Sequence, residues 1–315
     1  MITTITLNPS VDKLYCLPNA NLGSVMRLDS SVSTAGGKGL NVTRVLKKMD
    51  SEVLAIGIVG GLSGQFIEET LHQEGIVTDF THHGAESRSC INLLETSSQR
   101  QTEFLEPGAE VSQDTLDDFY ERFTNAVKLS RVVSMSGSLP KGVPLDYYAF
   151  LTRRAKSFGA KVIVDTSGPA LAEALDSAPE MVKPNLAEAS QLLNRQIQGL
   201  SDIVKAALEF VKCGVAIASI SLGAKGVVAA TSDEIFHVFP PEVAAVNTVG
   251  CGDSFVAAVA YGMDTFMPLE ETLKYACAIS AASSMTMETG NYRIQDLSDI
   301  WPHVTLNKIG KKALL

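Results

Sequence analysis

The stretch Asn247-Thr-Val-Gly-Cys-Gly-Asp-Ser-Phe255 places an acidic side chain directly behind two glycines, where an apolar helical run begins. A glycine-rich turn that leads into a helix presents unpaired backbone N–H groups, and such groups bind anions, phosphates above all. A carboxylate among these amides, here Asp253, is well placed to accept a proton from a hydroxyl that attacks a phosphate. An Asp at this position can also simply cap the helix. The rest of the chain favours phosphoryl transfer over the cap alone.

The composition is that of a soluble globular protein with an excess of acidic groups. The chain has 315 residues, of which 45% are hydrophobic and 19% are charged, and its formal net charge is -9. This length allows one large domain or two ordinary ones. The acidic balance argues against a nucleic-acid partner, which would need a basic face. No run approaches the roughly 18 apolar residues of a membrane span, and the first residues lack the layout of a signal peptide, so no membrane partner is expected.

The cysteines are scattered without paired spacing, and their number is odd: Cys16, Cys90, Cys213, Cys251 and Cys277. This pattern is typical of structural thiols in a reducing compartment. The sequence therefore predicts a cytoplasmic protein.

Strand-like and helix-like segments alternate along most of the chain. Strands are predicted at Ile2–Leu7, Val53–Val59, Arg131–Ser136, Lys161–Asp165 and Ala216–Ser221. Helices are predicted at Gly39–Met49, from about Gly64, at Leu116–Ala126, from Tyr148 to Phe158, around Val204–Val211, and at Ser254–Met263 and Leu269–Met287. The alternation predicts an α/β fold with a mostly parallel sheet that is covered by helices on both faces.

Two stretches, roughly 12–35 and 88–105, interrupt this alternation. They contain short strand-like segments without helices between them, at Ser30–Ala35, Cys90–Glu95 and Gln101–Leu105. We interpret them as an antiparallel flap, or lid, added to one edge of the main sheet. A sheet this small cannot easily bury both faces by itself. It should therefore cover a ligand, pair with a second copy of the chain, or do both.

A second glycine cluster, Thr34-Ala-Gly-Gly-Lys-Gly-Leu-Asn-Val-Thr-Arg44, indicates a binding turn. Its glycines, Gly36, Gly37 and Gly39, let a ligand approach the backbone closely. Lys38 supplies a positive charge and Asn41 a side chain that both donates and accepts hydrogen bonds. The combination suits a polyhydroxylated anion such as a sugar phosphate. An ordinary strand-to-helix turn would rarely need so much backbone freedom.

Three charged residues lie near this cluster in the predicted fold. Arg27 and Arg88 fall in the flap, and their guanidinium groups match phosphate geometry. With Lys38 they form a hypothetical phosphate clamp, although each is also an ordinary surface residue type. Asp12 follows the first strand at its carboxyl end, where open α/β sheets bind ligands, and it is also a common turn residue after a proline.

Two later segments carry polar groups at strand ends. In Met181-Val-Lys-Pro-Asn-Leu-Ala-Glu188, Asn185 and Glu188 could hold Mg²⁺ through waters, although Glu188 in a first helical turn is favoured by the helix dipole in any case. Ser221-Leu-Gly-Ala-Lys-Gly226 either covers nucleotide phosphates or is a simple hairpin turn into 227–231. Standard nucleotide signatures are absent, because the Gly37-Lys38 pair lacks the flanking residues of a Walker A loop.

Taken together, these motifs resemble the ribokinase / phosphofructokinase-B family of sugar kinases along essentially the whole chain. Gly36–Arg44 resembles the N-terminal signature of the family, and Val249–Ser254 resembles its C-terminal signature. Within the family, the sequence is most similar to the tagatose-6-phosphate kinase branch. That similarity is carried by Thr6–Asp12, Thr34–Leu46, Ser87–Ile91, Ser136–Gly142 with Asp146–Tyr148, and Glu288–Gly290. Cys251 departs from the family pattern, which has Ala or Ser there.

The resemblance implies a single ribokinase-like kinase domain over 1–315, with a Rossmann-like sheet and a small antiparallel β-lid that pairs two subunits into a homodimer. It implies that Asp253 is the catalytic base, within an anion hole formed by Gly250, Cys251 and Gly252. The residues implied to bind the sugar phosphate, together with the proposed clamp, are Asp12, Arg27, Gly36, Gly37, Lys38, Asn41, Arg88 and Gly137. Those implied to bind ATP are Lys183, Asn185, Ser221, Gly223, Lys225 and Gly226, with Asn185 and Glu188 organising Mg²⁺.

The implied reaction is transfer of the terminal phosphoryl group of ATP to the C1 hydroxyl of D-tagatose 6-phosphate, giving D-tagatose 1,6-bisphosphate. Phosphorylation of fructose 1-phosphate by a 1-phosphofructokinase is the alternative, because that enzyme shares most of the motifs. A non-catalytic sugar-phosphate sensor on the same scaffold is a third interpretation. A nicotinamide-dependent dehydrogenase fits less well, since the first βα turn lacks its glycine fingerprint.

Overall fold

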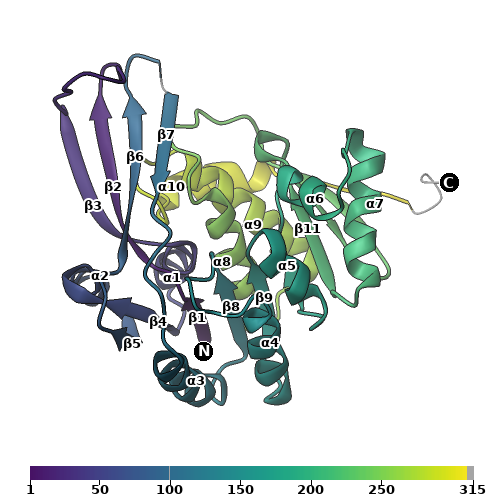
Figure 1. Cartoon of the computed structure of the whole chain (residues 1–315). Helices are drawn as coiled ribbons and strands as arrows, with labels where there is room; N and C mark the ends of the chain where they lie inside the picture. Colours follow the sequence, from purple (N-terminus) through teal and green to yellow (C-terminus); the bar gives the residue numbers. More distant parts are fainter. Residues whose placement is uncertain (99, 311–315) are drawn as a thin grey trace.

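The larger of two sheets is built from strands with buried Val and Ile residues on both faces. The computed structural model, which shows this arrangement, describes residues 1–98 and 100–310 (Figure 1). Strand β9 shows the principle: Val162 and Val164 pack into one core and Ile163 into the core on the opposite face. Alternation of side chains along a strand produces this split. Both faces are apolar, so helices cover both.

The described strands of the main sheet follow the order β14-β13-β12-β11-β10-β9-β8-β1-β4-β5. From β11 to β5 neighbouring strands are parallel, whereas β11 to β14 pair antiparallel at the other edge. Their bounds are β1 Ile2–Thr6, β4 Val53–Gly60, β5 Val77–His83, β8 Val132–Ser136, β9 Lys161–Asp165, β10 Met181–Val182, β11 Ile217–Ser221, β12 Val227–Ala230, β13 Ile235–Phe239 and β14 Thr305–Lys308. The predicted α/β class with a mostly parallel sheet is confirmed.

The helices form a layer on each face. One layer holds α3 Gln113–Val127, α4 Tyr147–Ser157, α5 Gly168–Leu175, α6 Leu186–Leu192 and α7 Gly199–Lys212. The other holds α1 Lys38–Lys48, α8 Cys251–Asp264, α9 Leu269–Ser284 and α10 Ile294–Ile300, while α2 Gly61–Gln73 lies beside β4 and β5. Short 3-10 turns occupy Gly223–Lys225 and Trp301–His303. In the part of the chain described here, no helix has both the length and the apolar composition needed to cross a membrane.

The second sheet, which we call the lid, consists of β2 Ser10–Leu17, β3 Ser30–Gly36, β6 Arg88–Glu95 and β7 Arg100–Leu105. Its order is β3-β2-β6-β7, and it stands over one end of the main sheet (Figure 1, purple to blue). Two expectations need correction. The lid is a separate sheet rather than an extension of the main one, and it is not purely antiparallel, because its central pair β2–β6 is parallel.

Several elements differ from the sequence-based expectation. The strands β5, β13 and β14 were not predicted. β5 and β14 consist mainly of polar residues, as in Val-Thr-Asp-Phe-Thr-His-His83, whereas the apolar residues of β13, Ile-Phe-His-Val-Phe239, were a usable signal. Helix α2 begins at Gly61 rather than near Gly64, and α9 ends at Ser284 rather than at Met287. Residues 311–315 of the predicted 1–315 domain lie outside the described part.

Candidate active site

The carboxyl ends of the parallel strands and the inner face of the lid enclose a cleft of about 720 Å³. Many of the residues singled out from the sequence line it: Asp12, Gly37, Lys38, Asn41, Arg88, Gly137, Lys183, Asn185, Glu188, Ser221, Gly250, Gly252 and Asp253. Segments that are far apart in the chain thus meet at one place, the edge of the sheet where α/β folds bind ligands.

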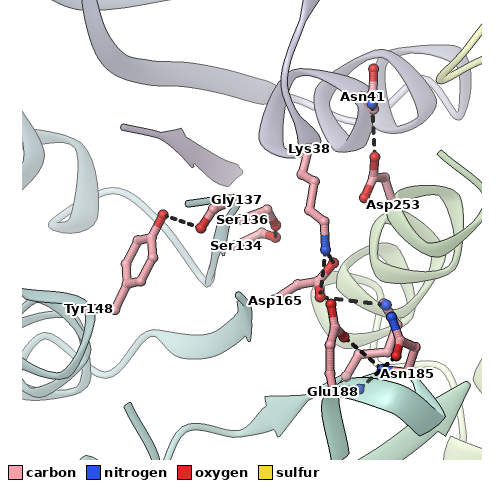
Figure 2. A network of polar contacts seen from close by, with 11 residues as sticks. Lys38, Asn41, Ser134, Ser136, Gly137, Tyr148, Asp165, Asn185, Glu188 and Asp253 are labelled. Atoms are coloured by element: carbon pink, nitrogen blue, oxygen red, sulfur yellow. Dashed lines mark hydrogen bonds and ion pairs between the residues drawn. The ribbon is translucent and has the colours of Figure 1, made fainter. Parts of the chain in front are cut away.

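Asp253 lies in the first turn of α8 and is almost completely buried, with 5% of its surface exposed. Its Oδ2 accepts a hydrogen bond of 2.8 Å from Asn41 Nδ2 of α1 (Figure 2). Burial raises the pKa of Asp253 to about 6, while the positive charge of Lys38 and the bond from Asn41 oppose that rise. A carboxylate with this pKa is ionised at neutral pH and is still basic enough to accept a proton.

The turn before α8 offers backbone donors beside this carboxylate. Gly250 caps the helix with a left-handed φ of 82°, and a side chain there would meet Thr289 at 2.4 Å. Within residues 1–98 and 100–310, no group accepts from the amides of Gly250, Gly252 or Asp253, whereas the Cys251 amide donates to the Thr248 carbonyl at 3.4 Å. The arrangement can therefore bind an anion at the start of α8.

Asp165, at the end of β9, links two of the lysines in the site. Lys38 Nζ lies 3.4 Å from both of its carboxylate oxygens (Figure 2). Lys183 Nζ lies 3.5 Å from Oδ1. Asp165 has no exposed surface and Lys183 has 4%. The Asp165 carboxylate raises the pKa of Lys38, so this side chain is charged.

On the lid side, the glycines make room for polar side chains. A side chain at Gly36 would overlap the carboxyl group of Asp12, which accepts a 2.5 Å hydrogen bond from Ser10 Oγ. Burial raises the pKa of Asp12, and Ser10 and Arg88 oppose the rise. Arg88 itself donates to the carbonyls of Asn8 and Glu106, at 3.1 and 3.0 Å. These bonds fix the guanidinium at the cleft wall.

Asn185 and Glu188 form a reciprocal capping box at the start of α6 (Figure 2). Asn185 Oδ1 accepts from the Glu188 amide, and Glu188 Oε2 accepts from the Asn185 amide, both at 2.8 Å. The box gives Glu188 a structural role in the first turn of α6, where the only structural role predicted from the sequence was a favourable interaction with the helix dipole. Both side chains also face the cleft, and their remaining oxygen lone pairs suit a hard cation.

Other predicted residues lie at or beyond the edge of the cleft. Arg27 is exposed in the connection between β2 and β3, and Gly36 lies behind Asp12. Gly223 and Lys225 lie in the 3-10 turn between β11 and β12, and Gly226 follows it. Because β11 and β12 pair antiparallel, this segment is a hairpin turn, one of the two alternatives predicted from the sequence. Cys251 is half-buried beside the anion hole, and its Sγ lies 3.9 Å from the Asn247 carbonyl oxygen.

Some cleft residues were not predicted from the sequence. Asp165 was assigned only as the end of a strand, although an acidic residue after Val-Ile-Val at a carboxyl strand end was a usable signal. Asn247 is buried, and its side chain accepts from the Val249 amide and donates to the Met287 carbonyl, which shapes the turn before α8. Thr6, the last residue of β1, and Asn8 also line the cleft; the Thr6–Asp12 segment carried part of the family resemblance, but neither residue was given a role.

Comparisons with known proteins agree with this geometry. The model of the pfkB family of carbohydrate kinases matches residues 2–295. A tagatose-6-phosphate kinase from Staphylococcus epidermidis is 38% identical over 312 residues, which cover 98% of this chain and 100% of that protein.

Solved structures give the same result. Phosphofructokinase-2 from Escherichia coli, in complex with potassium, superposes with a TM-score of 0.90 at 31% identity, covering 96% of this chain and 98% of that one. A possible 1-phosphofructokinase from Thermotoga maritima has a TM-score of 0.90 at 24% identity, covering 98% and 99% of the two chains, and this likeness shows the fold alone.

The family match covers nearly the whole chain, and the cleft holds a buried carboxylate at an amide-lined helix start. The chain therefore belongs to the pfkB family of carbohydrate kinases, enzymes that transfer a phosphoryl group from ATP to a sugar hydroxyl.

Proposed function

We propose that this protein phosphorylates the C1 hydroxyl of D-tagatose 6-phosphate and releases ADP and D-tagatose 1,6-bisphosphate. The observation that carries the proposal is the buried Asp253 at the anion-binding start of α8, in a chain 38% identical to a tagatose-6-phosphate kinase over its full length. The same cleft has a polar wall on the lid side, which suits a sugar phosphate.

The sugar phosphate is placed between the lid and α1. Asp12 and Asn41 are the hydrogen-bonding side chains for ring hydroxyls. Gly36 leaves room for the Asp12 carboxyl group, and Gly37 and Gly137 line the cleft beside the ring. Arg88 holds the 6-phosphate, with Lys38 at the boundary to the nucleotide. Arg27 joins this clamp only if the β2–β3 connection, where it is exposed, folds over a bound sugar or reaches a second subunit.

The nucleotide is placed along Lys183, Asn185 and Ser221, with Gly223, Lys225 and Gly226 at its outer side. Asn185 and Glu188 present oxygen atoms to the cleft, which fits Mg²⁺ bound through water. Among the described residues no group of three or more His, Cys, Asp or Glu side chains forms a metal site, so most ligands would come from phosphates and water. When bound, Mg²⁺ would neutralise charge on the nucleotide phosphates.

In the proposed step, the C1 oxygen forms a bond to the γ-phosphorus as the bond from that phosphorus to the β,γ-bridging oxygen breaks. The hydroxyl proton passes to Asp253 and then to solvent, and ADP leaves. The unpaired amides of Gly250, Gly252 and Asp253 point to a site for the charge of the transferred group. Positioning and charge neutralisation provide most of the rate, and the base adds about 10²–10⁴-fold.

A kinetic panel tests the substrate. Tagatose 6-phosphate, fructose 6-phosphate and fructose 1-phosphate are compared by direct ADP release, with MgATP saturating. The proposal expects the highest kcat/KM with tagatose 6-phosphate. A higher value with either fructose phosphate would reassign the enzyme, and no ADP release with any sugar would favour the sensor.

Fructose 6-phosphate is the second candidate substrate. It is supported by phosphofructokinase-2 from Escherichia coli in complex with fructose-6-phosphate, which superposes with a TM-score of 0.87 at 30% identity. Fructose 1-phosphate remains the alternative drawn from the motifs. The two ends of a ketohexose furanose are chemically similar, so discrimination depends on hydrogen bonds to ring hydroxyls.

We also propose that the chain acts as a single kinase domain and forms a homodimer through the lid, in the cytoplasm. The lid and its β2–β3 connection carry large exposed apolar side chains, including Phe104 of β7 at 53% and Val25 of the connection at 93% exposure, which supports a partner surface. The five free thiols support a reducing compartment. Sedimentation of wild type and Phe104→Glu tests the dimer, which the variant should weaken.

A further inference from the structure

Asp165 is a buried carboxylate that the proposed chemistry does not use directly. It ends β9 and has no exposed surface, and its backbone carbonyl accepts from the Gly137 amide at 3.0 Å. A sugar or nucleotide in the cleft therefore cannot touch its carboxylate without displacing what covers it. Any effect of this side chain on the reaction must pass through the groups that it holds.

Those groups are two lysines from two different motifs. Lys38 belongs to the glycine-rich turn at the start of α1, and Lys183 follows β10 in the Lys-Pro-Asn segment. Lys38 Nζ lies 3.4 Å from an Asp165 oxygen (Figure 2), and Lys183 Nζ lies 3.5 Å from one. One carboxylate thus ties together the sugar side and the nucleotide side of the cleft.

The position of Lys183 relates this cluster to the anion hole. A Cβ placed on Gly252 would lie 3.0 Å from Lys183 Nζ, so the ammonium group lies directly against the turn with the unpaired amides. Lys38 contributes to the charge around Asp253, whose pKa it lowers against the larger effect of burial. Both ammonium groups are therefore next to the place where a phosphoryl group would be transferred.

The ammonium groups of the cluster can also contact an anion. Lys38 and Lys183 pair with Asp165, and Asp253 and Glu188 add negative charge around Lys38. Both lysines line the cleft, and Lys38 has 39% of its side-chain surface exposed, so a phosphate oxygen in the cleft can approach it. Long lysine side chains lose conformational freedom when they are fixed, and here Asp165 fixes them before any ligand binds.

We infer that Asp165 is a positioning residue for phosphoryl transfer, which holds Lys38 and Lys183 so that both ammonium groups face the phosphoryl group as it moves from nucleotide to sugar. The inference rests on the proposed kinase function and extends it. It assigns Lys38 to the transferred group rather than to the 6-phosphate. Charges fixed in advance stabilise a transition state more than charges that must reorganise.

The first test compares Asp165→Asn with Asp264→Asn, using the best substrate of the panel. Asp264 is a matched control, because its carboxylate also lies between two cationic groups, Arg131 and the N-terminal amine, at 2.8 and 3.6 Å and away from the cleft. We expect kcat of Asp165→Asn to fall by about 100-fold, with KM for ATP changed less than about threefold. The control should keep its kcat, and an intact kcat in Asp165→Asn would overturn the inference.

A double-mutant cycle with Lys38→Met asks whether Asp165 acts through this lysine. If it does, Asp165→Asn should add less than about threefold to the loss already caused by Lys38→Met. Losses that multiply in this cycle and in the parallel cycle with Lys183→Met would contradict the inference. A higher Mg²⁺ requirement as the main change in Asp165→Asn would also contradict the inference, because it would make Asp165 a cation ligand.

A third readout does not need turnover. Pairing with Asp165 raises the pKa of Lys38, so its amine should be acylated slowly, and Asp165→Asn should speed acylation. Competitive acylation followed by mass spectrometry measures this, with the exposed Lys205 as the internal reference. Unchanged reactivity of Lys38 in Asp165→Asn would reject the pairing. This result does not depend on whether the wild type phosphorylates any of the three sugars, so the kinetic panel alone tests the proposed function.

Discussion

Asn41 and Asp253 meet across the cleft, with Asn41 Nδ2 donating to Asp253 Oδ2 at 2.8 Å. Asn41 comes from the N-terminal signature and Asp253 from the C-terminal one, so this bond joins the two halves of the site. It also orients one carboxylate oxygen and leaves the other for a substrate hydroxyl. A side chain held in this way is pre-organised for proton transfer.

Replacing Asp253 with Asn should abolish most turnover but leave sugar binding intact. Asp253→Asn preserves the shape of the side chain and can still accept the bond from Asn41, but it removes the base. We expect kcat to fall by about 10²–10⁴-fold with little change in the Kd of the sugar phosphate. Single-turnover ADP release and calorimetric binding measure the two quantities. Near-normal turnover would reject Asp253 as the base.

The pH dependence of wild type should report the same group. Asp253 must be ionised to accept a proton, and burial raises its pKa to about 6. We therefore expect kcat/KM to fall about tenfold per pH unit below pH 6 and to level off above it. ADP should be quantified directly, because coupling enzymes have their own pH profiles. A profile that stays flat down to pH 4.5 would contradict the assignment.

The contribution of Asp253 to the free energy of unfolding should depend on pH in the opposite direction from kcat/KM, falling as the carboxyl group ionises. A carboxyl group whose pKa rises from 3.8 to about 6 on folding stabilises the folded state below pH 3.8, and this contribution is lost as the pH rises through 6. A shift of about two pKa units, at about 1.36 kcal/mol per unit, changes the free energy of unfolding by about 3 kcal/mol at most. Asp253→Asn escapes this cost, so its free energy of unfolding relative to wild type should be more favourable at pH 7.5 than at pH 4.5. Urea unfolding at both pH values checks this, and an equal difference at both would be the contrary result.

The thiol at the anion hole should be unreactive. Burial and the nearby Asp253 raise the pKa of Cys251 to about 12, so little thiolate forms at pH 8. We expect iodoacetamide to modify the exposed Cys213 well before Cys251. Cys251→Ala should retain turnover, because the proposed step uses the neighbouring amides of Gly250, Gly252 and Asp253 rather than this thiol. Peptide mapping after partial alkylation gives the order. Early labelling of Cys251 with loss of activity would show that the pocket is more open than its burial implies.

The sequence predicted the parts of this protein that local chemistry determines. Apolar runs located most of the buried parallel strands, and two glycine turns located both ends of the site, because glycine there permits left-handed backbone or a close contact, as at Gly250 and Gly36. The polar edge strand β5 gave no such signal.

Contacts made by tertiary packing could not be predicted in this way. The pairing of Asp165 with two lysines joins the ends of β9 and β10 to the start of α1 and is not visible in any local pattern. The parallel pairing of β2 with β6 is likewise set by the path of the chain between them. Separate stretches of strand-like residues do not reveal their relative direction.

That parallel pair has a consequence for the order in which the protein folds. Ser10 of β2 lies beside Arg88 of β6, and β3, α1, β4, α2 and β5 lie between them in the chain. Contacts between distant segments form only after the intervening chain has compacted, because closing a long loop costs entropy. We expect the lid, and with it the sugar end of the cleft, to gain hydrogen-exchange protection late in refolding, after the nucleotide end has formed around β9 to β11.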